Sequence, residues 1–175
     1  MVVSQPCLFC LHVVLGFQGP ANASPLLAVV EQCIELAAAE SSNVSGYTSS
    51  KSGLVGVYAT ASAADGSAVT DQLCSIMTTV PSADIISRAT RLAKANALFS
   101  IDGGDSASLA KEMTESVLES GSFSYADVAA KFDAVSVDQV QAAFSAMGGS
   151  TPSMAAVGDI SSIPYHGSIV TRFSS

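Results

Sequence analysis

The longest strongly apolar run in the chain extends from Cys7 to Phe17 and is interrupted only by His12. A run of this length is too short to cross a hydrocarbon core as a helix, which needs about 20 residues. Turn-forming residues, Gln18-Gly19-Pro20, follow directly, and Ser24-Pro25 then supplies an N-cap and a first-turn proline. We therefore predict a buried strand from Leu8 to Phe17, followed by a helix.

Composition limits the kinds of partner that such a chain takes. Its 175 residues are about the length of one ordinary domain. Of these, 49% are hydrophobic and 13% charged, which excludes a disordered tail. Protein surfaces usually carry about 25–35% charged residues, so we expect partners to cover part of this one. The net charge of −8 argues against nucleic-acid binding. No basic residue precedes Lys51, so neither a secretory signal nor an Arg-rich presequence is predicted.

Strand and helix patterns alternate along the rest of the chain. Enrichment in Val, Thr and Tyr predicts two strands, Gly46–Ser50 and Gly53–Ala61, and Ser153–Val157 is predicted as the last strand. Pro164 is expected to begin a C-terminal tail. Between them, cap signals and helical spacing predict helices that start near Asp65, Pro81, Ser106, Ser124 and Ser136. This order favours a single domain over 1–175, an α/β (α+β) sandwich whose mainly antiparallel sheet has helices packed on one face.

Four segments, taken in their order and spacing, carry a family resemblance. The first, Tyr47 to Tyr58, is similar to a "Y-S-D-S-G-L-F-G-x-Y" strand pair, and Ala95 to Asp102 and Phe132 to Val140 follow at the family's spacing. Pro152 to Tyr165 is similar to a "K-S-M-A-A-S-G-x-L-G-x-T-P-F" ending. The chain resembles the mitochondrial processing-peptidase and respiratory core-protein branch of the pitrilysin/insulinase-like superfamily. The resemblance covers only the C-terminal of that family's two homologous halves, and Ser41 to Gly46 is shorter than the loop found there.

The resemblance implies a non-catalytic structural (core) subunit of respiratory complex III, ubiquinol–cytochrome c reductase. Such a subunit lies on the matrix side of the mitochondrial inner membrane, peripheral to the membrane, and serves scaffolding and assembly. Its expected partners are a core protein one-like subunit, the missing N-terminal half and other complex III subunits, with no nucleic acid and no cofactor. The alternative within the same family is a non-catalytic alpha-type subunit of the mitochondrial processing peptidase, which binds basic presequences.

The histidines do not support metallopeptidase chemistry. A catalytic member needs H-x-x-E-H on one helix, where two imidazoles hold zinc and a carboxylate acts as the base. The chain has only His12 and His166, and neither lies in that frame. We therefore predict no enzyme activity and no catalytic, cofactor-binding or metal-binding residues. His12 is expected to face a hydrogen-bond partner or a polar cavity, and His166 to be exposed.

The cysteines allow a second alternative of a different class, a small thiol-redox protein. Cys7 and Cys10 have C-x-x-C spacing, but redox pairs lie at a helix N-terminus, where the helix dipole lowers the thiol pKa. Here the pair falls in or just before a strand, in which residues three apart point to opposite faces. Structural thiols are favoured for these two residues and for Cys33 and Cys74.

Two charged stripes are predicted on neighbouring helices. Arg88, Arg91 and Lys94 recur every three residues on one helix, and carboxylates recur on the next, at Glu112, Glu115 and Glu119. A solvated helix face explains both. The alternatives for the basic stripe are an acidic partner or anionic lipid headgroups, and for the acidic stripe a basic partner surface.

Overall fold

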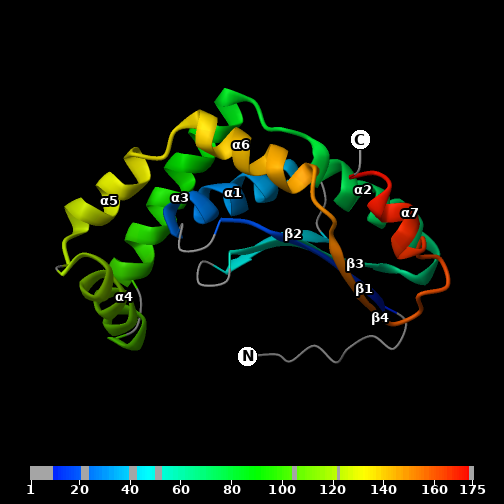
Figure 1. Cartoon of the computed structure of the whole chain (residues 1–175). Helices are drawn as coiled ribbons and strands as arrows, with labels where there is room; N and C mark the ends of the chain where they lie inside the picture. The colour runs from blue at the N-terminus through cyan, green and yellow to red at the C-terminus, as the bar shows by residue number, and fades with distance from the viewer. Residues whose placement is uncertain are drawn as a thin grey trace.

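The computed structural model describes residues 10–20, 24–39, 43–49, 53–103, 106–121 and 123–173. The strands and helices follow the predicted order, and most of their ends fall within a few residues of the predicted ones (Figure 1). Their bounds are β1 Cys10–Gln18, α1 Ser24–Ala37, β2 Val44–Ser49, β3 Leu54–Ser62, the short 3-10 helix η1 Ala63–Asp65, α2 Gly66–Thr78, α3 Ala83–Gly103, α4 Ser106–Ser120, α5 Tyr125–Asp133, α6 Val137–Gly148, β4 Ser153–Val157 and α7 His166–Val170.

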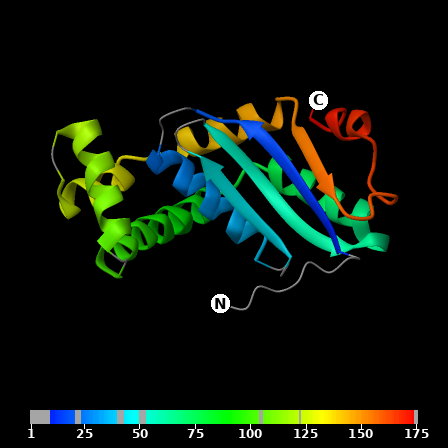
Figure 2. The ribbon, with the colours of Figure 1, turned by 90° about the horizontal axis from the view of Figure 1, so that it is seen from below.

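The four strands form one antiparallel sheet in the order β2-β3-β1-β4. The apolar strand β1 occupies a central position and pairs with β3 on one side and with β4 on the other. Figure 1 shows α1 and α6 on one side of the sheet, with α4 and α5 beyond its end, and Figure 2, seen from below, shows the strands in front of α1 and α6. The predicted fold class, a mainly antiparallel sheet with helices on one face, is confirmed.

The core lies between the helices and the face of the sheet that they cover. Successive strand residues point to opposite faces, so alternate residues of β1 reach this core. Leu11, Val13, Leu15 and Phe17 are at most 1% exposed, and each lies opposite a small or branched apolar residue of β3. The helices close the core with buried side chains that include Val29, Val30, Ile34, Leu73, Met77, Ile86, Phe144 and Met147.

Side-chain caps define where two of the helices begin. Ser124 accepts a hydrogen bond from the Ala126 N–H at the start of α5. At the start of α6, the Ser136 hydroxyl accepts from the Gln139 N–H, and the Gln139 side chain accepts from the Ser136 N–H. The capping box that the sequence predicts is confirmed, and α6 ends at Gly148 as expected.

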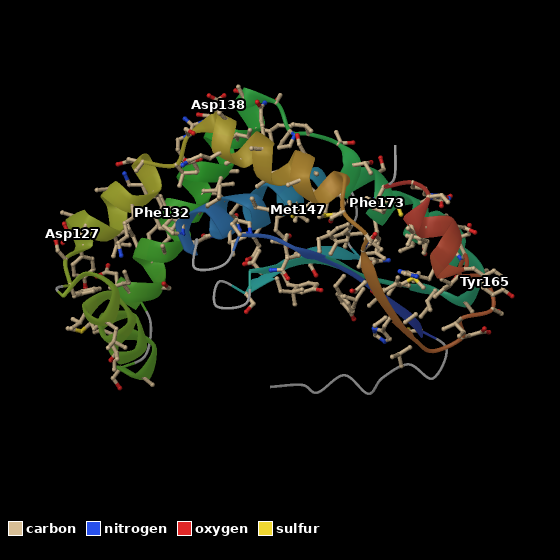
Figure 3. All side chains as sticks on the ribbon, viewed as in Figure 1. Asp127, Phe132, Asp138, Met147, Tyr165 and Phe173 are labelled. Atoms are coloured by element: carbon tan, nitrogen blue, oxygen red, sulfur yellow. The ribbon has the colours of Figure 1, made fainter. Side chains whose placement is uncertain are left out.

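The prediction of a tail from Pro164 is wrong. The segment forms the short helix α7, and its apolar residues Ile169 and Phe173 are 0% and 2% exposed. Figure 3 labels Phe173 beside α7. The Phe173 ring centroid lies 5.1 Å from that of Phe17, the last core residue of β1. Ile169 lies within α7 and Phe173 in the turn that follows it, and both pack into the core although the segment is too short to show a periodic pattern.

Candidate functional site

The sheet has a second face, which points away from the helices and is called the open face below. Strand register assigns its residues, because directly paired residues share a face. None of them is Asp, Glu, Lys or Arg. A solvated sheet face usually carries polar and charged side chains, so a face without charge is typical of a surface that another protein covers. The open face comprises Cys10, His12, Val14, Gly16, Gln18, Ser45, Tyr47, Ser49, Leu54, Gly56, Tyr58, Thr60, Ser62, Ser153, Ala155 and Val157.

Tyr47 covers a pair of glycines at the centre of the open face. Gly16 and Gly56 lie directly opposite each other on β1 and β3. A Cβ atom at Gly56 would overlap the Tyr47 ring and approach the Leu15 carbonyl oxygen, and one at Gly16 would lie 3.1 Å from the Tyr47 hydroxyl oxygen. The ring therefore lies against the backbone, and burial raises the pKa of Tyr47. Because the Tyr47 ring lies against the backbone, it does not project from the centre of the open face. A neighbouring surface can therefore approach closely there.

His12 and Tyr58 form a polar pair beside the glycines. The His12 Nδ1 atom lies 2.6 Å from the Tyr58 hydroxyl oxygen, and the two rings stack with centroids 5.9 Å apart and planes 21° apart. The expectation that His12 has a hydrogen-bond partner is confirmed. Among the described residues, no group of three His, Cys, Asp or Glu side chains could hold a metal ion.

Aliphatic side chains complete the open face at two of its edges. Leu54 is 39% exposed and Val157 is 70% exposed. Burial of such a side chain against a partner is favourable, by about 25 cal/mol for each Å² of apolar surface removed from water. Neutral hydroxyls, aromatic rings and aliphatic groups of this kind can pack against a protein surface.

Two carboxylates of α1 bind β2. The Gly46 N–H donates to Glu35 Oε1 at 2.8 Å, and the Thr48 hydroxyl donates to Glu31 Oε2 at 2.5 Å. The first bond takes up a backbone group of β2, and the second holds a side chain, so together they link the helix to this outer strand of the sheet. The sequence analysis did not identify these glutamates, although their spacing of four residues places both on one face of α1.

The cysteines lie in different environments. Cys7 is outside the described residues, and Cys10 lies half-buried on the open face. Cys33 is buried in the core, where burial raises the pKa of its thiol to about 12. Burial also raises the pKa of Cys74, although Arg172 acts in the opposite direction. A raised pKa keeps both core thiols protonated and unreactive.

The three residues of the basic stripe have different surroundings in the structure. Lys94 contacts both carboxylate oxygens of Asp133 on α5, at 2.8 and 2.7 Å, and so links two helices. Arg88 and Arg91 are exposed on α3. The acidic stripe falls on α4 as predicted, but the side chains of Glu112, Glu115 and Glu119 lie outside what the structure describes.

His166 is exposed as predicted, at the first position of α7, and its Nε2 lies 2.8 Å from the Pro152 carbonyl oxygen. It thereby connects α7 to the residue before β4. The other histidine, His12, lies within β1 on the open face, so the two imidazoles belong to different parts of the fold.

One shallow pocket of about 370 Å³ lies between the β1–α1 connection and α6. Gly19, Pro20 and Leu26 line one side of it, and alanines of α6 line the other. Its polar residues are two glutamines, Gln18 and Gln139. The other lining residues are apolar, so the pocket suits an apolar group.

Comparison with known proteins supports the fold. No family model and no curated protein matches the chain. It is similar to a solved chain of complex III2 from Candida albicans with Inz-5 bound, with a TM-score of 0.78 and 15% identity. The match covers 94% of this chain and 46% of that one, so this chain spans less than half of its neighbour's length. Within the described residues, no helix is both long and apolar enough to cross a membrane. The similarity establishes that this chain has the fold found in one part of a complex III chain.

Proposed function

We propose that the chain is a non-catalytic structural subunit of respiratory complex III, similar to the half of core protein two that the sequence resembles. The observation that carries this proposal is the structural likeness, which extends over 94% of this chain and 46% of a chain in complex III2. The sequence resemblance, drawn from motifs in four separate segments, points independently to the same assembly. The proposed location is the matrix side of the mitochondrial inner membrane, peripheral to the bilayer.

The open face supports the proposal because it fits an assembly surface. Desolvating a charged side chain costs several kcal/mol unless it is paired, so surfaces that become buried are depleted in charge. Here none of the residues on a four-stranded face is charged. In the proposal, the open face packs against the N-terminal half that such subunits have. A core protein one-like subunit and other complex III subunits complete the surroundings.

The test is the composition of the native particle that contains this chain. Membranes from the native source are solubilised in mild detergent and separated by native electrophoresis, with the chain detected by antibody and haem by its absorption spectrum. We expect the chain to migrate with the haem-containing particle. A stable 17.7 kDa monomer in the native extract would contradict the proposal.

Two variants then test whether the open face forms the contact. Val14→Asp and Val157→Asp each place a carboxylate on it, whereas Leu118→Asp places one on α4, where Leu118 is 81% exposed. We expect the first two variants to fold but to leave the particle, and Leu118→Asp to remain in it. Retention of all three would show that the open face is not the contact.

The alternative within the same family is an alpha-type subunit of the mitochondrial processing peptidase. The net charge of −8 favours it, because it attracts basic presequences over long distances. The same separation distinguishes the two functions. A soluble matrix dimer that carries zinc and lacks haem indicates the peptidase.

The thiol-redox function requires a reactive pair at Cys7 and Cys10. Its test is the double variant Cys7→Ser, Cys10→Ser, measured for disulfide reduction with a chromogenic disulfide substrate. Equal rates for the variant and the unchanged chain would exclude this function. The proposed structural role predicts that the rates are equal.

A further inference from the structure

The longest helix, α3, carries apolar side chains on the outside as well as on its buried face. Ile86, Ala89 and Ala93 face the core. Ile85, Leu92 and Phe99 do not, and they are 37%, 36% and 72% exposed. Figure 2 shows α3 as the long green helix at the border of the helical layer. The α3 stripe, defined as Ile85, Leu92 and Phe99, is thus an apolar row that the rest of the described chain covers only in part.

The α3 stripe has the spacing of a helix-pairing seam. Its three residues are seven apart, so they follow one another along the helix with a drift of only about 20° per step. A spacing of seven residues corresponds to one position of the heptad repeat. This repeat is found where two helices pack along their length. A row in this register fits a second helix lying alongside α3.

Two arginines lie at the centre of the seam. Arg88 follows Ile85 by three residues and Arg91 directly precedes Leu92, so both flank the middle of the α3 stripe. Both are exposed, and neither has an ion-pair partner within the described part of the chain. Lys94 does not share this role because Asp133 neutralises it. A partner helix therefore needs carboxylates opposite these two positions.

We propose that the α3 stripe with Arg88 and Arg91 is a docking surface for an acidic amphipathic helix of another protein subunit. An anionic membrane fits less well. Lipid-binding clusters usually hold about four to eight basic residues, whereas this seam has two between the exposed carboxylates Asp84 and Asp102. The surface lies on α3 and is separate from the open face of the sheet.

The test uses two synthetic helices as probes. Both carry Leu at the a and d heptad positions; one has Glu and the other Lys at e and g, and like charges there discourage each peptide from pairing with itself. Binding to the full chain is measured by fluorescence anisotropy. We expect the Glu peptide to bind at least about tenfold more tightly than the Lys peptide, and salt to reduce this preference.

Charge reversal on α3 makes the test specific. In the double variant Arg88→Glu, Arg91→Glu, the preference should reverse, so that the Lys peptide binds more tightly. Leu92→Asp should abolish binding of the Glu peptide, and Leu118→Asp, on α4, should leave it unchanged. The thermal midpoint of each variant is measured alongside. If Leu92→Asp unfolds the chain, the arginine double variant decides the outcome, because it alters only exposed side chains.

The outcomes that overturn the proposal are equally specific. Equal affinity for both peptides, or a preference that charge reversal leaves unchanged, excludes the docking surface. Binding to vesicles of anionic lipid that depends on Arg88 and Arg91 assigns the surface to a membrane instead. Dimerisation that Leu92→Asp abolishes, seen by sedimentation, assigns it to a second copy of this chain. Because the probes are added to the isolated chain, these results do not depend on whether the chain belongs to complex III.

Discussion

The two faces of the sheet are built from alternate residues of the same strands, yet they serve different purposes. Val13 and Val14 are neighbours on β1, and Val13 is fully buried under the helices whereas Val14 lies half-buried on the open face. The core face holds branched aliphatic side chains that fill a volume. The open face holds glycines, aromatic rings, hydroxyls and a few aliphatic groups, again without charge. The absence of charge from both faces agrees with the proposal that a partner covers the open face, as the helices cover the core face.

The largest effect should come from placing the same charge on each face in turn. Val13→Asp puts an unpaired carboxylate into the core, which we expect to cost about 3–5 kcal/mol of unfolding free energy. Val14→Asp puts it on the open face, in contact with water, and should cost less than about 1 kcal/mol in the isolated chain. Urea unfolding of both variants measures the difference. Similar losses in the two would mean that the open face is already covered within this chain.

The sequence predicted the fold because its local signals agree with one another. The capping box at Ser136, the cap at Ser124 and the strand Ser153–Val157 all appear where they were expected. The prediction of a tail from Pro164 was wrong because one buried residue in a five-residue helix, Ile169, and one in the turn after it, Phe173, give too weak a pattern. Helix ends and strands could be predicted from neighbouring residues, since the interactions that fix them span only a few positions.

The open face could not be predicted in the same way. The first strand reads as apolar on both sides, because Val14 and Gly16 interrupt the polar alternation that would mark a solvated face. The contact of Tyr47 with Gly16 and Gly56 joins three strands, and only their register brings it about. A site made by pairing distant segments leaves no local spacing in the sequence. The basic stripe on α3 was predicted, but the different roles of its residues were not, because the ion pair of Lys94 depends on Asp133, 39 positions away.

The next largest effect on stability is expected from a comparison of two glycine-to-alanine substitutions. Gly56→Ala places a Cβ atom against the Tyr47 ring and the Leu15 carbonyl oxygen, and we expect it to cost about 1–3 kcal/mol. Gly167→Ala, in α7, meets nothing within 4 Å and should leave stability unchanged or raise it slightly. Thermal unfolding measures both.

A second substitution shows which contact of Gly56 dominates. Tyr47→Ala combined with Gly56→Ala removes the ring but leaves the carbonyl oxygen, so only part of the loss should be recovered. If the double variant recovered all of the lost stability, the backbone at Leu15 would be free to move away from the added Cβ atom. The glycine pair would then not be needed to bring the two strands and the Tyr47 ring together.

The core thiol should produce a smaller effect, which depends on pH. Cys33 has a pKa of about 12 in the folded chain against 9.0 for an ordinary thiol, because burial disfavours the thiolate. Between these values the unfolded chain loses the proton and the folded chain keeps it, so stability falls as pH rises, by at most about 1.4 kcal/mol per pH unit. Below about pH 8 the group contributes no pH dependence.

Urea unfolding at several alkaline pH values checks this expectation, with Cys33→Ala as the comparison. The variant should be less stable at every pH but should lose less stability between about pH 9 and pH 10. Cys10→Ala, on the open face, serves as the matched control and should decline with pH more nearly as the unchanged chain does. Parallel curves for the unchanged chain and Cys33→Ala would show that water reaches this part of the core.

The smallest effect belongs to the polar pair on the open face, and it carries the most information about the partner. Tyr58→Phe removes the 2.6 Å hydrogen bond to His12 and keeps the ring. A typical hydrogen bond contributes about 0.5–1.5 kcal/mol, and we expect the lower end here, because water can replace the lost hydroxyl in the isolated chain. Tyr165→Phe is the control, since Tyr165 is 89% exposed and the change should have no effect.

The same substitution should have a larger effect in the assembly. Once a partner excludes water from the open face, no water can replace the Tyr58 hydroxyl beside the His12 nitrogen. Tyr58→Phe should therefore cost more in affinity for the native particle than in stability of the isolated chain. Equal costs would mean that the pair stays in contact with water in the assembly and that the partner covers only the rest of the open face.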